Sequence, residues 1–338
     1  MKKSVFLGVV GAAGLAAASA SASTLEDVKA RGELNCGVNT GLVGFAAPDA
    51  NNNWQGFDVE LCRAVAAATL GDPDAVTYVP LTGKTRFTAL AAGEIDMLSR
   101  NTTWTFSRDV DLKFEYNGIN YYDGQGFMVP RELGVTSALD LDGATVCIQT
   151  GTTTELNLAD FFRSNNMSYE PVPIETNAEA QQQYLAGACD VYTTDTSGLA
   201  ATRAAFESPD DHVILPEIVS KEPLGPLVRH GDNEWGDIVR WTLNALISAE
   251  ELGITSANVA ELSNGTDNPE INRLLGTEGG LGAMLGLEPD WAKNALMATG
   301  NYGEIFERHI GENTPIGLAR GLNAQWTDGG LLYSPPFR

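Results

Sequence analysis

Along residues 33–98, segments in which hydrophobic residues recur with the period of a strand alternate with segments in which they recur with the period of a helix. Leu34, Cys36 and Val38 alternate with polar positions, which is typical of a strand. After a loop rich in Gly and Asn, Asp58 precedes an Ala-rich run with a helical period. Strands are predicted at 33–39, 76–79 and 95–98, and helices at 59–70 and 85–92. This order predicts an α/β fold built on a doubly wound, mainly parallel sheet.

A second unit follows with the same layout. Strands are predicted at 126–129, 144–150, 169–174 and 190–194, and helices from 152 onward and at 179–185. The unit has the size of an ordinary lobe. The Pro-rich segment 216–229 is expected to return the chain to the first lobe, before a strong helical pattern over 235–252. The sequence thus predicts lobe 1 at 23–126, lobe 2 at 127–225, and a return to lobe 1 with a C-terminal extension at 226–338.

The first 22 residues are typical of a cleavable signal peptide. Lys2 and Lys3 precede an apolar stretch, and Ala20-Ser21-Ala22 fits the rule of small residues before a cleavage site. A membrane anchor is the alternative, but the apolar stretch is short and no stop-transfer segment follows it. We therefore expect export to the periplasm of a Gram-negative bacterium.

Acidic residues outnumber basic ones by 44 to 21, and the formal net charge is −23. A field of this sign repels nucleic acid and anionic lipid, so no nucleic-acid partner is expected. It does not exclude an anionic ligand, because a binding site needs only local positive groups.

The four cysteines are an even number, which in an exported chain suggests disulfides. Their positions, Cys36, Cys62, Cys147 and Cys189, allow three pairings, and none of them has the spacing of a metal site. The three histidines are scattered, so neither a metal nor another cofactor is expected.

Polar residues that suit an amino-acid ligand follow the predicted strand at 95–98. A free amino acid carries a carboxylate, which favours a planar Arg, and an ammonium, which favours an acid. Asn101, Thr103 and Arg108 lie at the carboxyl end of this strand, where open α/β sheets bind ligands. A polar surface turn with an exposed Arg is the alternative.

The second unit offers matching groups at the ends of two strands. Thr152 and Thr153 open a helix, where free backbone N–H groups suit a carboxylate. The alternative is a capping box of Thr152 with Glu155, and both interpretations can hold together. Asp195 ends another strand, and its alternative role is to cap the helix that follows.

Arg108, Thr152, Thr153 and Asp195 fall within motifs that resemble those of the amino-acid-binding proteins of polar amino-acid ABC importers. The motifs are Gly56-Phe57-Asp58-Val59-Glu60-Leu61, Gly93-Glu94-Ile95-Asp96, Thr105-Phe106-Ser107-Arg108, the Gly151-Thr152-Thr153 turn and the strand-ending Asp195. Longer strings are similar to the general L-amino acid binding subgroup. They are Ser99 to Trp104, Tyr122 to Phe127, Ser220 to Pro226 and Arg320 to Ala324.

The resemblance implies two lobes, joined by two crossing strands, that close on an L-amino acid. Arg108 would clamp the α-carboxylate, helped by Thr103 and by the turn at Thr152 and Thr153. Asp195 would take the ammonium, with Asn101 in support. The ligand would be polar or of broad range, including Glu, Gln, Asp and Asn. The membrane permease subunits of an ABC importer would be the partner of a monomeric protein.

Two disulfides, Cys36–Cys62 and Cys147–Cys189, are expected, because each lies within one lobe and a cross-lobe pair would oppose closure. The pocket for the ligand side chain departs from the family pattern. Leu42 stands where many relatives have an aromatic residue, and Arg100 and Asn101 replace small hydroxyl residues.

Three questions stay open at this point. Lys84 and Arg86 are expected to be solvated charges at a helix start, and a place in the pocket, favouring Glu or Asp, is the alternative. Cyclohexadienyl dehydratases resemble this family, but no residue is assigned to such a reaction, so a binding protein rather than an enzyme is expected. A role as the sensing partner of a membrane receptor is the third reading.

Overall fold

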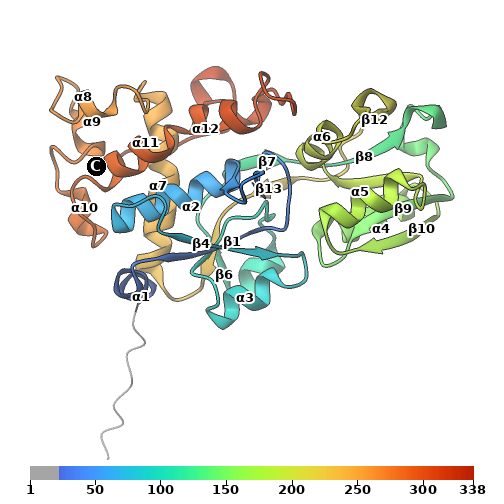
Figure 1. Ribbon diagram of the computed structural model, residues 1–338, viewed down its shortest axis with the longest axis horizontal. Helices are drawn as coiled ribbons and strands as arrows, with labels where there is room; N and C mark the ends of the chain where they lie inside the picture. Colours follow the sequence, from blue (N-terminus) through green and yellow to red (C-terminus); the bar gives the residue numbers. More distant parts are fainter. Residues whose placement is uncertain (1–22) are drawn as a thin grey trace, which may run out of the picture.

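The computed structural model describes residues 23–338, so the expected signal peptide lies outside the described residues. Two five-stranded sheets form the centres of two lobes that lie side by side (Figure 1). The strand orders are β4-β1-β5-β14-β6 and β10-β9-β11-β8-β12. The chain therefore has the two-lobed α/β fold that the sequence predicts. No helix within residues 23–338 is long and apolar enough to cross a bilayer.

Lobe 1 contains the elements predicted from the first alternation. Its strands are β1 (Leu34–Asn39), β2 (Ala47–Pro48), β3 (Trp54–Gln55), β4 (Val76–Leu81), β5 (Met97–Leu98), β6 (Phe114–Tyr116) and β14 (Leu227–Arg229). Its helices are α1 (Thr24–Arg31), α2 (Phe57–Leu70), α3 (Arg86–Ala92) and α7 (Asn233–Glu251). Helix α2 is buried along most of its length, and its small Ala side chains let other helices pack closely against it.

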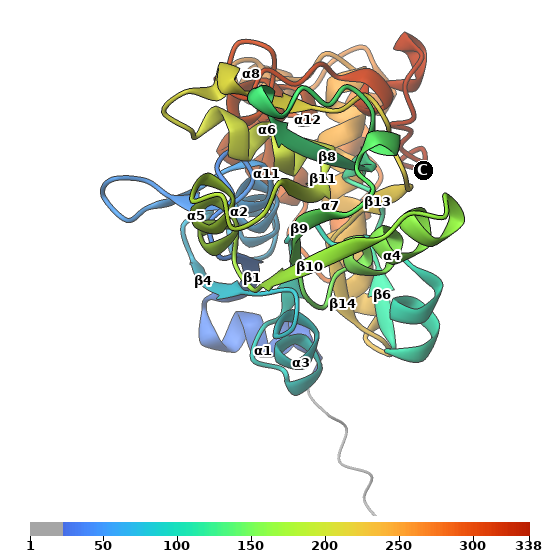
Figure 2. The same ribbon diagram turned by 90° about the vertical axis from the view of Figure 1, so that its right-hand side faces the viewer.

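Lobe 2 repeats this plan and has its own core. Its strands are β8 (Gln125–Pro130), β9 (Ala144–Gln149), β10 (Tyr169–Ile174), β11 (Val191–Asp195) and β12 (His212–Ile214). Its helices are α4 (Thr153–Ser164), α5 (Asn177–Leu185) and α6 (Thr196–Ala204), and Figure 2 shows them around the sheet. Phe127, Val146 and Phe162 are buried among the residues of one apolar cluster here.

Both sheets combine parallel and antiparallel pairs. Strand β1 is parallel to β4 and β5, and β9 is parallel to β10 and β11, as the alternation of strands and helices predicts. Strands β8 and β14 run antiparallel to their neighbours. Each of them enters its sheet directly from a crossing between the lobes, which reverses its direction, so the sheets are mixed.

Two short strands carry the chain between the lobes. Strand β7 (Tyr121–Asp123) leads out of lobe 1, and β13 (Glu222–Leu224) leads back. They pair antiparallel, with Tyr122 opposite Pro223, and form a two-stranded sheet between the lobes (Figure 1).

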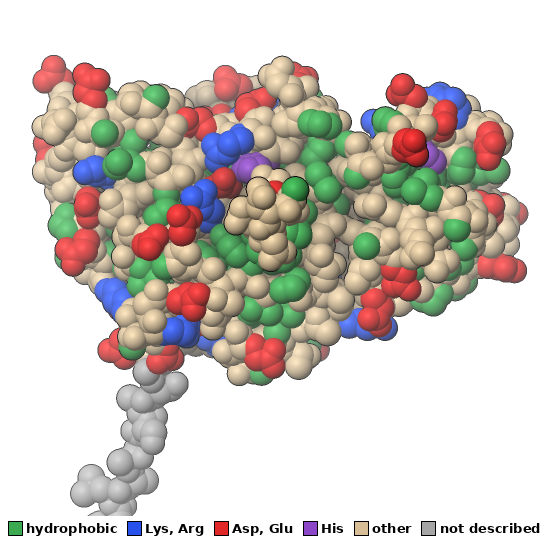
Figure 3. All heavy atoms as spheres, in the orientation of Figure 1, with side chains coloured by type: hydrophobic (Ala, Val, Ile, Leu, Met, Phe, Trp, Pro, Cys, Tyr) green, Lys and Arg blue, Asp and Glu red, His purple; other side chains and the backbone are tan. Residues whose placement is uncertain are grey.

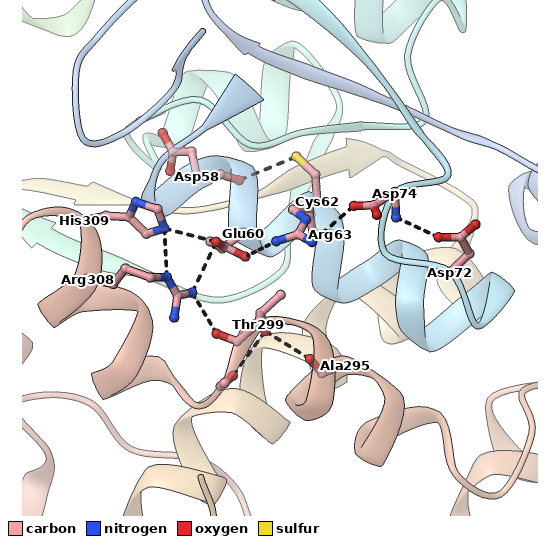
Figure 4. A network of polar contacts seen from close by, with 11 residues as sticks. Asp58, Glu60, Cys62, Arg63, Asp72, Asp74, Ala295, Thr299, Arg308 and His309 are labelled. Atoms are coloured by element: carbon pink, nitrogen blue, oxygen red, sulfur yellow. Dashed lines mark hydrogen bonds and ion pairs between the residues drawn. The ribbon is translucent and has the colours of Figure 1, made fainter. Parts of the chain in front are cut away.

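The C-terminal extension packs on lobe 1. Its helices are α8 (Val259–Leu262), α9 (Pro269–Leu274), α10 (Leu281–Met284), α11 (Trp291–Thr299) and α12 (Tyr302–His309). A polar network attaches α12 to α2 (Figure 4): Glu60 accepts from His309 at 3.0 Å and pairs with Arg308 at 3.2 Å and Arg63 at 3.2 Å. These partners lower the pKa of the buried Glu60 carboxyl although burial opposes them, so the ionised form holds the extension in place.

The structure contains both expected disulfides, Cys36–Cys62 and Cys147–Cys189. The first joins β1 to α2, and the second joins β9 to Cys189, two residues before β11 begins. Each disulfide crosslinks residues of a single lobe. Neither disulfide joins one lobe to the other, so neither restricts the movement of the lobes about the two crossing strands.

Candidate functional site

A small cavity lies between the lobes, at the carboxyl ends of the strands. It is lined by Arg86, Arg100, Asn101, Thr103, Gln149, Thr152, Thr153, Thr154, Thr194 and Asp195. Five of the six predicted ligand-binding residues are among them. Arg108, the sixth, is buried beside the cavity but does not line it; its Nη1 donates to the Thr103 carbonyl at 2.8 Å.

The loop after β5 supplies the lobe 1 side. Asn101 has a positive φ of 26°, which turns the chain sharply at the end of the strand. Its N–H donates to Asp58 Oδ2 at 3.0 Å, and its Oδ1 accepts from Asn39 Nδ2 at 3.1 Å. Burial raises the pKa of Asp58 to about 6. Asp58 thus fixes the backbone of the loop at Asn101 and does not line the cavity.

Three arginines gather on this side. Arg86 donates to Thr102 Oγ1 at 3.1 Å while its buried Nε has no hydrogen-bond partner, and Arg100 Nε donates to the Leu81 carbonyl at 2.8 Å. Burial, and repulsion from the other arginines, lower the pKa of Arg86, and burial lowers that of Arg100 to about 10. The cavity therefore borders a local excess of positive charge.

The expectation of solvated charges at the start of α3 is correct for Lys84 and wrong for Arg86. Lys84 is exposed and pairs with Glu175 of lobe 2 at 2.8 Å. Arg86 is only 3% exposed. The helix begins at Arg86, and its first turn points this side chain inward over the Phe87 ring, whose centroid is 4.8 Å from the guanidinium carbon.

The first turn of α4 forms the lobe 2 side. Thr152 caps this helix by accepting from the Glu155 N–H at 3.2 Å. Glu155 accepts in turn from the Gly151 N–H at 2.9 Å, so the capping arrangement is shifted by one residue from a capping box. The capping interpretation therefore holds, and the same turn also lines the cavity.

Asp195 ends β11 and lines the cavity. Although it occupies the N-cap position of α6, its side chain makes no capping hydrogen bond. Burial raises the pKa of Asp195 well above its ordinary value, and the charges of Asp123 and Glu222 act in the same direction. A cationic group brought into the cavity would relieve this penalty by stabilising the ionised carboxylate.

Glu222, for which the sequence predicts no role, connects the lobes beside the cavity. Its carboxylate, 1% exposed, accepts from the Thr103 hydroxyl of lobe 1 and from the Thr153 hydroxyl of lobe 2, the latter at 2.9 Å. Asn157 Nδ2 and Ser220 Oγ donate to it at 2.7 Å each. The string Ser220 to Pro226 contains this residue, but only the fold shows that it reaches both lobes.

We expect Glu222→Gln to weaken ligand binding about tenfold, or ~1.4 kcal/mol, because Oε2 accepts from the two threonine hydroxyls and Oε1 from Asn157 and Ser220, and the amide NH2 replaces one of these two acceptors. Titration calorimetry would measure the change. Glu217→Gln is the matched control, since the Glu217 carboxylate binds Ser137 and Ala138 within lobe 2. Equal affinities for Glu222→Gln and the wild type would contradict this role.

The lobes approach each other closely at the rim of the cavity. A Cβ atom at Gly83 would lie 2.7 Å from the Thr150 carbonyl oxygen of lobe 2, so only glycine fits this approach without a shift. The Lys84–Glu175 ion pair lies next to it. Any solute held in the cavity would thus be in contact with both lobes.

Among residues 23–338 there is no group of three or more His, Cys, Asp or Glu side chains that could hold a metal ion. The chemistry that the described cavity offers is recognition of charge: the guanidinium groups of Arg86 and Arg100 and the carboxyl group of Asp195 lie around hydroxyls and a helix N-terminus, with Arg108 buried beside them.

Comparison with known proteins places this geometry in a family. The chain is 67% identical over its full length to the glutamate/glutamine/aspartate/asparagine-binding protein BztA of Rhodobacter capsulatus, which it also covers completely. It is 59% identical, with full coverage of both chains, to the general L-amino acid-binding periplasmic protein AapJ of Rhizobium johnstonii. Both relatives are named as binding proteins.

A solved structure with the same fold is an ABC transporter periplasmic binding protein from Brucella ovis with glutathione bound. It is 58% identical, with a TM-score of 0.91, and covers 94% of this chain and 100% of that chain. Residues 34–257 match the family model described as bacterial extracellular solute-binding proteins, family 3. The chain belongs to this family of bacterial extracellular solute-binding proteins.

Proposed function

We propose that this protein captures L-amino acids with acidic or amide side chains in the periplasm and delivers them to an ABC importer. The observation that carries the proposal is the cluster of Arg86, Arg100 and Arg108 around a cavity that contains one acid, Asp195. On the face shown in Figure 3, acidic side chains are spread over both lobes. The charge around the cavity is therefore opposite in sign to the charge of these acidic side chains.

The charge balance favours a ligand with two carboxylates and one ammonium. Arg108, with the N-terminus of α4 at Thr152 and Thr153, would bind the α-carboxylate. Asp195, with the Asn101 amide beside it, would bind the ammonium. Thr103 would hold Arg108 through its carbonyl. Arg86 and Arg100 would then face the side chain of the ligand, and a carboxylate there would offset the repulsion between them.

The names of the relatives agree with this class of ligand. BztA is named for binding glutamate, glutamine, aspartate and asparagine, and AapJ for binding L-amino acids in general. We infer the same delivery route for this chain: a monomer exported by the signal peptide at 1–22, with lobes at 23–126 plus 226–338 and at 127–225, which docks on membrane permease subunits.

The test is identification of the ligand. Mass spectrometry of small molecules released from the purified protein is expected to find Glu, Gln, Asp or Asn. Calorimetry with these four, with Ala and Lys, and with glutathione would rank their affinities. Tight binding of glutathione with no binding of any amino acid would contradict the proposal, as would equal affinity for Ala and Glu.

Ligand binding is expected to compact the protein, because a ligand held by Arg108 and Asp195 contacts both lobes and stabilises the closed arrangement. Small-angle scattering with saturating glutamate would show a smaller radius of gyration. In Gly83→Val the larger side chain meets the Thr150 carbonyl, so the compaction should be smaller and the affinity about tenfold lower. A wild-type protein that keeps its dimensions at saturation would rule out closure.

A further inference from the structure

The end of the C-terminal extension lies against one of the two crossing strands. The family model ends at residue 257, so this segment lies outside the part that defines the family. Its short helical turn η5 (Gly321–Asn323) packs against β7. The extension therefore reaches the place where the chain leaves lobe 1.

Asn323 binds the backbone of β7 in both directions. Its Oδ1 accepts from the Tyr122 N–H at 2.7 Å, and its Nδ2 donates to the Tyr122 carbonyl at 3.1 Å. The side chain of Asn323 is buried, with 4% of the residue exposed. An amide that pairs with both groups of one residue acts as a neighbouring strand would, and within residues 23–338 β7 has only β13 as a strand partner.

The extension holds Asn323 firmly against lobe 1. Arg320 Nε donates to the Asn323 carbonyl at 2.9 Å, and its Nη1 and Nη2 bind Glu250 of α7 at 2.8 and 3.1 Å. Tyr302 of α12 donates its hydroxyl to the Asn120 carbonyl at 2.8 Å, one residue before β7 begins. Lobe 1 and its extension thus fix the chain as far as Tyr122.

The next residue is held by the other lobe. Asp123 Oδ1 accepts from Thr196 Oγ1 at 2.7 Å, and the Ser197 hydroxyl donates to Oδ2. The Gly124 carbonyl accepts from the Thr196 N–H at 2.8 Å. Thr196 and Ser197 begin α6 of lobe 2, so two consecutive residues, Tyr122 and Asp123, are bound to opposite lobes.

We propose that the C-terminal tail is a hinge clamp and that Asn323 is a positioning residue for closure. By holding Tyr122 on lobe 1, it confines the bending of β7 to the link between Tyr122 and Asp123. A single short pivot fixes the direction in which the lobes approach each other. Asp195 and the arginines then reach the ligand in the correct relative positions. The proposal rests on the proposed function only in that closure serves ligand binding.

Asn323→Ala tests the clamp. Single-molecule energy transfer between labels on the two lobes, attached through unnatural amino acids at the exposed Asp27 and Ser164, would report the distance between the lobes in the ligand-free protein. We expect a broader distance distribution than in the wild type, and on the order of fivefold faster dissociation of glutamate. Asn323→Asp, which keeps the acceptor for the Tyr122 N–H, should restore part of the narrow distribution.

Asn264→Ala is the matched control, because the Asn264 amide binds only carbonyls in the extension, those of Ala260 and Glu261. It should leave the distance distribution unchanged. The clamp is overturned if the distance distribution of Asn323→Ala remains that of the wild type. This holds whether the melting temperature of the variant falls or stays the same. Failure of the proposed ligand class would appear separately, as a wild type that binds no amino acid, and the ligand-free distances would still decide the clamp.

Discussion

Asp195→Asn is expected to weaken binding of an L-amino acid by two to three orders of magnitude, or about 3–4 kcal/mol. The buried carboxyl of Asp195 is the acidic side chain among those that line the cavity, and it makes no capping hydrogen bond. Asparagine keeps the shape of the site but cannot neutralise the ligand ammonium. Calorimetry would measure the loss. Asp190→Asn is the matched control, because Asp190 comes directly before β11, at the opposite end of the strand from Asp195. A change below threefold would remove Asp195 from the site.

The same residue predicts a pH dependence. The pKa of Asp195 is raised, chiefly by burial, so the empty site binds a proton at a higher pH than an ordinary Asp does. An ammonium ligand needs the ionised form, so binding releases this proton, and affinity falls as pH decreases through the raised pKa. Calorimetry in buffers of different ionisation enthalpy would detect the proton. Asp58, with a pKa of about 6, titrates in both proteins, so the loss of proton release in Asp195→Asn isolates Asp195.

Arg100→Met is expected to lower the affinity for glutamate and aspartate about 100-fold, or ~2.7 kcal/mol, and that for glutamine and asparagine much less. The side-chain carboxylate of an acidic ligand interacts with the Arg100 guanidinium charge to charge, which is stronger and of longer range than the interaction with a neutral amide. The loss of affinity is therefore larger for glutamate and aspartate than for glutamine and asparagine. The ligand-free protein should change little in stability, because relief of the burial of one guanidinium and of its repulsion from the other arginines is opposed by loss of the hydrogen bond to the Leu81 carbonyl and of the attraction to Asp58 and Asp195. A melting curve would check this second expectation.

Lys84→Met provides the control for Arg100→Met. Lys84 carries the same charge near the same helix but is exposed and pairs with Glu175 across the rim. Its loss should affect acids and amides equally and slightly. If Arg100→Met weakened glutamate and glutamine by the same factor, Arg100 would have only a structural role.

The sequence predicted what depends on local periodicity and on strand ends. The strands around β1 and β9 and the helix cap at Thr152 follow from residues near one another in the chain, whereas the alternative role of Asp195 as a cap is wrong, because its side chain makes no capping hydrogen bond. Side chains at the ends of β5 and β11 meet because each strand ends at the carboxyl edge of its own lobe's sheet, and residues from both edges line the cavity between the lobes. These local and topological rules were enough to find five of the residues that line the cavity.

The sequence did not predict contacts that depend on how the lobes meet. Arg86 is exposed or buried according to the packing of α3 against the loop at Thr102, and Lys84, two residues earlier, points the other way. Glu222 obtains its role only because β13 passes between Thr103 and Thr153. The role of Asn323 depends on a contact with Tyr122, about two hundred residues earlier in the chain.

The two disulfides also affect how the protein should be produced. Each closes a loop within one lobe: Cys36 and Cys62 are 26 positions apart, and Cys147 and Cys189 are 42 positions apart. Such bonds stabilise a fold by roughly 2–4 kcal/mol. In a reducing cytosol both bonds would be absent, and nascent chains would stay easier to unfold. Material made there and later oxidised in the test tube should melt at a higher temperature than the same preparation kept with reductant. Cytosolic expression therefore calls for an oxidising strain or a refolding step.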